Sequence, residues 1–337
     1  MSDVSLWTAG TETRPCPLCG GRGHTAASTR MQHGLNLTTK ICDECSFVFT
    51  NPLPAREIYE RFYQDAYADY YGHITPKPEG SRLKVEPASL TTKFNRIEQT
   101  RPLVGCRLLE VGPGPGLFLW WARERGCEVL GVEPSPDFCR FLAEAELPHL
   151  AGTLADVRAE AHGRFDIIFM SHVLEHFYDP NEALQHCRSL LADGGVLAVE
   201  VPNILRPFRS LDDYFLRYVH PSNFAPQTLV AMLEKHGFLP ECVDGGGNDW
   251  RSPQNLFVSA RKANETPLKL RIPRQGSEEV LDVFRKYRQA WRWKLAPLWY
   301  SRSLVLAARR MAYRGAHGLK RLLTGCSPAK TMPIHQL

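Results

Sequence analysis

The sequence contains no run of about 18 consecutive apolar residues, so no transmembrane helix is expected. Its opening residues, MSDVSLWTAG, have neither a basic start nor an apolar stretch, which argues against a secretory signal. The sequence also shows no internal repeat and no low-complexity tract. A protein with these absences is expected to work in the cytoplasm.

The chain has 337 residues, of which 43% are hydrophobic and 23% are charged, as expected for a soluble globular protein of about two domains. Its formal net charge of +5 is unevenly distributed. Residues 280–323 contain eleven Lys and Arg and one acidic residue, Asp282, which gives this segment a charge of +10. The remainder therefore carries about −5, and this asymmetry indicates that the tail contacts a membrane surface or a polyanion.

The ten cysteines do not follow a disulfide pattern. Four of them form two C-x-x-C pairs, CPLC and CDEC, which are separated by 22 residues. Two such pairs are typical of a tetrahedral zinc site, and four unrelated cysteines are the alternative. Because a fold of about 50 residues has too small a core to be stable alone, a structural zinc is expected. The predicted ligands are Cys16, Cys19, Cys42 and Cys45.

A glycine-rich turn lies between an apolar strand and a helix in the segment RLLEVGPGPGLFL, residues 107–119. Gly112, Gly114 and Gly116 permit backbone conformations that other residues resist, and they allow amide groups to approach a ligand closely. The next strand, EVLGVEPS, ends in Glu133, whose carboxylate is placed to accept hydrogen bonds from ribose hydroxyl groups. This order of elements predicts a cofactor site.

Strands and helices alternate through the centre of the chain. Helices are predicted at 117–126, 138–147, 180–195 and 226–238. Strands are predicted at 108–111, 128–133, 165–171, 196–203, 241–246 and 255–262, and a short strand followed by a turn is predicted at 149–157. This alternation predicts a doubly wound α/β sheet whose last two strands form a hairpin-like pair.

The segments LLEVGPGPGLFL, GVEPS, FDIIFMSHVLEHFYDP and LLADGGVLAVEVPN occur in order, within residues 100–262. Together they resemble the class I S-adenosylmethionine-dependent methyltransferases, which implies a Rossmann-like seven-stranded methyltransferase sheet. With two cysteine pairs in front, the chain resembles the zinc-ribbon methyltransferases of bacterial sugar and cell-envelope biosynthesis. A dinucleotide oxidoreductase is the rival interpretation, and the single core and paired last strands argue against it.

The resemblance implies S-adenosyl-L-methionine as the cofactor and assigns its contacts. In the family, the first-motif acid and glycines hold the methionine part, so Glu110 and the three glycines of the turn would do so here. Glu133 would hold the ribose. Thr153 and Leu154 form the turn that would lie beside the adenine, with Asp156 as a nearby alternative. Ser171 and His172 would border the reactive sulfonium.

Directly after the fourth predicted strand, SHVLEHF places His172, Glu175 and His176 at spacings i, i+3 and i+4, which would share one face of a helix. His220, in HPSNF, is expected to reach the same pocket. A family branch that includes small-RNA and ubiquinone O-methyltransferases binds a divalent metal through E-x-x-E-H and a later histidine, a pattern similar to this one. Three roles stay open: a metal site, a general base at His176 or His220, or a structural role.

The basic tail also carries an apolar helix face. Val280, Phe284, Tyr287 and Trp291 recur at i, i+4, i+7 and i+11, and arginines flank them. Basic amphipathic helices that contain tryptophan suit anionic membranes, so residues 280–323 are predicted to contact the inner face of the membrane peripherally. Packing on the catalytic core is the alternative. Nucleic acid is not an expected partner, because the rest of the chain is acidic.

Four parts are predicted: a zinc ribbon at 1–52, a helical cap and lid at 53–100, an S-adenosylmethionine-binding methyltransferase domain at 101–262, and a basic, aromatic helical extension at 263–337. Replacing Cys42 by Ser is then expected to unfold the ribbon alone. The expected reaction is O-methylation of a sugar, nucleotide-sugar or lipid-linked glycan. Sugar C-methylation, quinone or lipid O-methylation, RNA methylation and a non-catalytic cofactor-binding module are the alternatives.

Overall fold

The computed structural model describes residues 10–32, 35–65, 87–208, 210–246, 255–264 and 277–295. Residues 1–285 form one compact unit and residues 286–337 a second, and each is described by itself. Within the described ranges, every helix is too short or too polar to cross a membrane. Residues 66–86 of the predicted helical cap and lid, and residues 296–337 of the tail, lie outside the described residues.

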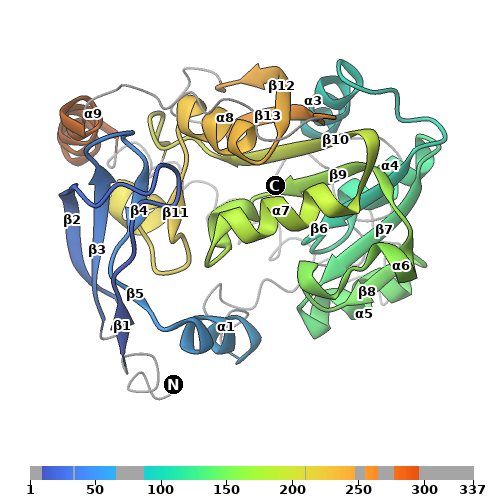
Figure 1. The fold of residues 1–337 in the computed structure, drawn as a ribbon, viewed down its shortest axis with the longest axis horizontal. Coiled ribbons are helices and arrows are strands. Elements are labelled where there is room, and N and C mark those ends of the chain that lie inside the picture. Colours follow the sequence, from blue (N-terminus) through green and yellow to red (C-terminus); the bar gives the residue numbers. More distant parts are fainter. Residues whose placement is uncertain are drawn as a thin grey trace, which may run out of the picture. The chain divides into compact units, whose positions relative to one another are not determined.

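A seven-stranded sheet forms the centre of the first unit, in the order β12-β13-β10-β9-β6-β7-β8 (Figure 1). Strands β8, β7, β6, β9 and β10 pair in parallel, whereas β13 is antiparallel to both of its neighbours. The predicted Rossmann-like fold and the hairpin-like last pair are therefore confirmed. The strands are β6 (Arg107–Val111), β7 (Glu128–Glu133), β8 (His149–Ala151), β9 (Phe165–Ser171), β10 (Leu191–Pro202), β12 (Phe238–Asp244) and β13 (Asn255–Lys262).

Two of the helices between these strands begin at a residue whose side chain caps them. The side chains of Ser135 and Asp179 accept a backbone N–H at the starts of α5 and α7, and a proline follows each. Several predicted boundaries are wrong. The helix expected over 180–195 ends at Leu190, and its two glycines lie in an irregular start of β10. The helix expected over 226–238 ends at Lys235, because Gly237 has a left-handed φ of 73° and Phe238 already begins β12. The helix expected over 138–147 spans Pro136–Glu144. The elements are α3 (Ala88–Glu98), α4 (Leu117–Glu124), α5 (Pro136–Glu144), η3 (Leu154–Asp156), α6 (Ala159–His162), η4 (Leu174–His176), α7 (Pro180–Leu190), η5 (Leu211–Phe215) and α8 (Pro226–Lys235).

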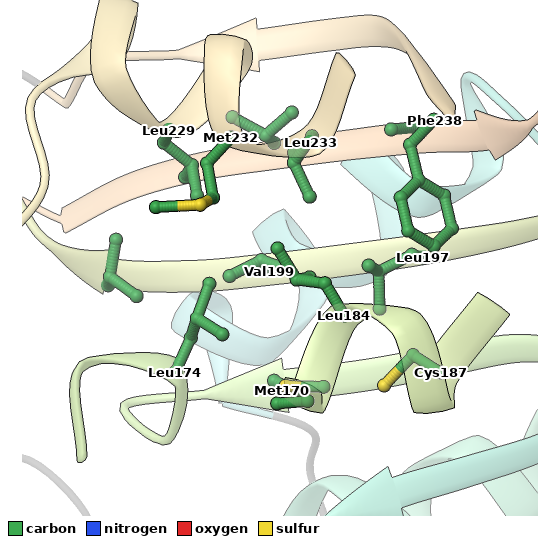
Figure 2. Packing of buried hydrophobic residues seen from close by; sticks show 14 of the residues in the cluster. Met170, Leu174, Leu184, Cys187, Leu197, Val199, Leu229, Met232, Leu233 and Phe238 are labelled. Atoms are coloured by element: carbon green, nitrogen blue, oxygen red, sulfur yellow. The ribbon is translucent and has the colours of Figure 1, made fainter. Parts of the chain in front are cut away.

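Both faces of the sheet are covered. Leu184 from α7 and Met232 from α8 pack with Leu197 and Val199 of β10 on one face (Figure 2). Ala198 lies between those two strand residues and packs in the cluster that α3 and α4 form on the other face. Successive side chains of a strand point to opposite faces, so a strand covered on both sides needs apolar residues at every position.

The N-terminal cysteine pairs lie beside a second sheet, of four strands, with the order β11-β4-β3-β2. Cys42 ends β3, and the other three cysteines lie in the connections before β2 and β4. Its strand β11 comes from the segment directly after His220, and it pairs with β4. Leu18, Phe47 and Phe49 belong to the same buried cluster as the centre of the main sheet, which the sequence did not predict. The boundary at residue 52 stays a prediction. The elements are β1 (Thr11–Glu12), β2 (His24–Gln32), β3 (Leu35–Cys42), β4 (Val48–Thr50), β5 (Leu53–Pro54), α1 (Arg56–Asp65) and β11 (Ser222–Asn223).

The start of the tail is helical, as predicted. Helix α9 (Ser277–Ala290) is followed by the π-helical turn η6 (Trp291–Leu295). In the first unit, Val280 and Phe284 are buried, which agrees with the predicted apolar face. In the second unit, Tyr287 stacks on Trp291 with ring centres 6.2 Å apart.

Candidate active site

The carboxyl ends of β6, β7, β9 and β10 meet at one edge of the sheet, because these strands are parallel. The glycine turn follows β6, and Gly112, Gly114 and Gly116 have left-handed φ angles of 66°, 53° and 76°. A Cβ at Gly116 would lie 2.5 Å from a Leu142 methyl group, whereas one at Gly114 would meet nothing within 4 Å. Packing therefore requires glycine at 116, and Gly114 is where the backbone can approach a ligand.

The predicted ribose acid, Glu133, is buried and holds the glycine turn in place. Its Oε2 accepts a hydrogen bond from Gly114 N at 3.0 Å, and its Oε1 accepts one from Ser135 N at 2.9 Å. Burial raises the pKa of Glu133, and these two N–H donors oppose the shift. The carboxylate thus ties the end of β7 to the turn after β6.

The first-motif acid, Glu110, is only 4% exposed, and its Oε2 has no hydrogen-bond partner. Burial raises the pKa of Glu110 to about 8, with Lys93 lowering it and Glu133 raising it further. A buried acceptor without a partner costs free energy unless a ligand supplies a donor or a positive charge. Glu110 therefore suits the cationic methionine part of the predicted cofactor.

The turn predicted to lie beside the adenine is held by its own side chains. Thr153 N and Oγ1 both donate to Asp156 Oδ2, at 2.8 and 2.9 Å. The backbone N–H of Thr153 is the main cause of the lowered pKa of Asp156. The side chain of Leu154 is buried in the core, so any adenine contact at this position would come from its backbone. The adenine role of the turn stays a prediction.

A buried polar network joins the ends of β9, β10 and β13. Lys93 Nζ, from α3, lies 2.8 Å from Glu200 Oε1 and donates to Ser171 Oγ at 3.0 Å. Asn255 Nδ2 donates to Glu200 Oε1 at 3.1 Å and lies 3.0 Å from His172 Nε2. Lys93, Glu200 and Asn255 were not among the predicted site residues. A lone acid in the apolar strand VLAVEVP was a usable signal for Glu200, whereas the other two belong to no motif.

The segment SHVLEHF is not an α-helix, so the predicted shared helix face is wrong. His172 has a left-handed φ of 57°, which a right-handed helix cannot include, and the 3₁₀ turn η4 follows it. The turn still brings Glu175 and His176 together with His220, because their possible ligand atoms all lie within 4.8 Å of one another. His172 Nδ1 is 3.4 Å from Glu175 Oε1 at the border of this group.

Hydrogen bonds set the tautomers of the two histidines. His176 Nδ1 lies 2.7 Å from Val219 O, and His220 Nδ1 lies 3.1 Å from Phe215 O. Because a carbonyl oxygen can only accept, both Nδ1 atoms carry the hydrogen, and Nε2 holds the lone pair of each neutral ring. Burial lowers the pKa of both rings, to about 3 for His220. Both imidazoles are therefore neutral at pH 7.

Glu175 completes this group as a buried carboxylate. It is 2% exposed, and neither of its oxygens accepts a hydrogen bond of good geometry, although His172 Nδ1 lies 3.4 Å from Oε1. Burial by itself would raise its pKa, but His172 and His176 outweigh this effect, so the pKa of Glu175 is lowered. One carboxylate and two neutral imidazoles are ligands that suit zinc, manganese or iron. The residues present therefore fit a divalent metal.

The four predicted zinc ligands also lie together. All four Sγ atoms lie within 4.8 Å of one another, and the Cys16–Cys45 and Cys19–Cys42 sulfur pairs are each 3.5 Å apart. Zn–S bonds of about 2.3 Å in a tetrahedron place neighbouring sulfurs about 3.8 Å apart, which is close to these values. The cysteines of the zinc ribbon therefore fit a closed structural site.

A family model described as a methyltransferase domain matches residues 56–243. Among curated proteins, the chain is 29% identical over 238 residues to a ubiquinone biosynthesis O-methyltransferase of Cereibacter sphaeroides (strain KD131 / KCTC 12085), covering 68% of this chain and 84% of the relative. It is 33% identical over 180 residues to one of Caulobacter sp. (strain K31), covering 49% and 71%. Among solved structures, 1,6-didemethyltoxoflavin-N1-methyltransferase of Burkholderia thailandensis is 17% identical, with coverages of 65% and 96% and a TM-score of 0.48.

Proposed function

The chain belongs to the S-adenosylmethionine-dependent methyltransferases, and from this premise we propose that it methylates a hydroxyl oxygen held beside Glu175, His176 and His220. The observation that carries the proposal is the buried carboxylate of Glu175, which accepts no hydrogen bond of good geometry and lies against two neutral imidazoles. The same three residues fall inside the range that the family model matches.

In this reaction the acceptor oxygen attacks the methyl carbon of the sulfonium. The carbon–sulfur bond breaks, its electron pair stays on sulfur, and the hydroxyl proton passes to water. Glu110 and Glu133 would hold the cofactor, so that its methyl group lies in line with an acceptor oxygen about 3 Å away. A divalent metal bound by Glu175, His176 and His220 would lower the pKa of the acceptor hydroxyl.

For the acceptor, we propose a ring hydroxyl of a quinone precursor. The support is that relatives with substantial coverage are named ubiquinone biosynthesis O-methyltransferases. The sequence favoured a sugar or glycan hydroxyl, which becomes the second candidate. One observation supports this second candidate. The four cysteines of the N-terminal ribbon, which resembles the ribbon of the sugar methyltransferases, lie outside the family-model match, which begins at residue 56.

To test this, the protein is incubated with methyl-labelled S-adenosylmethionine and one of two sets of acceptors. The first set consists of dihydroxybenzoates with an apolar side chain, and the second consists of nucleotide sugars. We expect label on the phenolic oxygen. Label only on sugars would support the second candidate, and label on a carbon or nitrogen atom would overturn the hydroxyl proposal.

The role of the carboxylate and imidazole group is tested separately. Glu175→Ala and His220→Ala should each lower turnover by about 10²–10⁴-fold. His162→Ala, a matched change on α6, should leave it unchanged. A chelator should abolish turnover, and added divalent metal should restore it, with ribbon zinc measured in parallel. Full turnover in the presence of the chelator, together with full turnover of the Glu175→Ala variant, would contradict the proposed catalytic metal.

A further inference from the structure

The two histidines of the proposed site come from segments that are far apart in sequence. His176 ends the turn η4, and His220 lies two residues before β11. The segments bond directly at the site, where the His176 ring donates to Val219 O. Tyr59 of α1 adds a second link, because its hydroxyl donates to His176 O at 2.9 Å and lies 3.4 Å from Val219 O.

A third link comes from the N-terminal ribbon. The guanidinium of Arg14 donates through Nη1 to Tyr178 O at 2.6 Å and through Nη2 to Pro221 O at 3.2 Å. Tyr178 lies two residues after His176, and Pro221 follows His220 directly. A single planar group therefore bridges the two segments that carry the histidines, at carbonyls one and two residues beyond them.

Arg14 is itself held by the ribbon. Its backbone N and O both bond the Asn51 side chain at 3.0 Å, and its guanidinium lies 5.8 Å from the ring centre of Phe49. Cys16, the first predicted zinc ligand, is two residues away. The ribbon also bonds Pro221 O directly, through Thr50 N at 3.0 Å. Two groups of the ribbon therefore donate to the same carbonyl oxygen beside His220.

We infer that Arg14 is a positioning residue that sets the spacing of His176 and His220, a role that rests on the proposed function of this pair. The planar guanidinium offers donors in a fixed fork, so it can hold two carbonyls at one separation. A metal site needs its ligands held within about 0.5 Å of their working positions. Without the bridge, Tyr59 and the His176–Val219 bond would be left to hold the two segments at that spacing.

The test compares Arg14→Met with Arg56→Met. Arg56 is a matched control, since its guanidinium also lies over the Tyr178 ring, 4.8 Å from its centre, but bonds Glu182 on α7 instead of a backbone carbonyl. Three readouts are taken on full-length, zinc-loaded protein. They are Mn²⁺ binding by electron paramagnetic resonance, S-adenosylhomocysteine binding by calorimetry, and the ring resonances of ¹³C-histidine-labelled protein.

We expect Arg14→Met to weaken Mn²⁺ binding at least tenfold and to move the resonances of His176 and His220, while S-adenosylhomocysteine affinity and the resonance of His149 stay unchanged. Arg14→Lys, which keeps the charge but not the fork, should give an intermediate loss, and it serves as the test if Arg14→Met does not fold. Arg56→Met should resemble the natural protein.

The outcomes separate the two proposals. If the natural protein binds no Mn²⁺ but the two histidine resonances still move in Arg14→Met, the proposed metal site is refuted and the positioning role of Arg14 stands. Unchanged resonances with unchanged Mn²⁺ affinity in Arg14→Met would overturn the positioning role. A fall in S-adenosylhomocysteine affinity as large as that for Mn²⁺ would also overturn it, because that result indicates general unfolding.

Discussion

Replacing Cys42 by Ser removes one predicted zinc ligand from a ribbon that shares its core with the methyltransferase sheet. If the ribbon were independent, this change would unfold only the N-terminal 50 residues or so. The structure leads to a different expectation. Phe47 packs edge-on against Phe224, with ring centres 5.5 Å apart, and Phe224 lies directly after β11. Loss of the ribbon fold would therefore expose one side of the main core.

The magnitude follows from three side chains. Leu18, Phe47 and Phe49 are 1%, 0% and 0% exposed. Burying one such side chain stabilises a protein by about 1.5–3 kcal/mol, so the three together contribute about 5–9 kcal/mol. The whole free energy of unfolding of a typical protein is about 5–15 kcal/mol. Unfolding the ribbon should therefore remove most of the stability of residues 1–285.

The assay is calorimetric unfolding together with zinc content and S-adenosylhomocysteine binding. We expect Cys42→Ser to show one transition at a lower temperature, less than one zinc per chain, and loss of S-adenosylhomocysteine binding near that transition. Cys242→Ser, the same chemical change on β12 outside the ribbon, should leave all three properties nearly unchanged. Two separate transitions, with the upper one and S-adenosylhomocysteine affinity preserved, would refute the shared-core reasoning.

Three further predictions concern the cofactor acids and the tail. Glu133→Ala should lower the affinity for S-adenosylmethionine at least tenfold in calorimetry, because each charge-assisted hydrogen bond of the Glu133 carboxylate contributes about 1.5–3 kcal/mol. Glu128→Ala, at the exposed end of β7, should leave the affinity unchanged. Burial raises the pKa of Glu110 to about 8 in the folded state. Between the ordinary pKa of a glutamate and about pH 8, the folded protein therefore keeps a proton on Glu110 that the unfolded protein has lost. The free energy of unfolding should therefore fall as pH rises to about 8, and Glu110→Gln should flatten that slope in denaturant titrations; an unchanged slope would contradict the assignment. Deleting residues 286–337 should abolish co-sedimentation with anionic vesicles and preserve cofactor affinity; retained sedimentation would exclude the tail as the membrane contact.

Local patterns determined most of the fold. The strand LLEV, the glycine turn and the acid at the end of the next strand are short-range features, and the structure has each where it was predicted. Glycines with left-handed φ and apolar runs of strand length are required by backbone sterics and burial alone, so they can be recognised without knowing what lies around them. The two C-x-x-C pairs are equally readable, because each is a tight turn with its own spacing.

The candidate site needed the tertiary structure. The i, i+3, i+4 spacing of His172, Glu175 and His176 predicted a helix face, yet β9 runs into a left-handed residue and a 3₁₀ turn there. The sequence alone identified His220 as a partner of that turn only through the resemblance, and it gave no sign that Arg14 bonds the backbone beside both histidines. Such contacts join residues more than 150 positions apart, and they form only when the main sheet and the ribbon pack into one core, a geometry that no local spacing encodes.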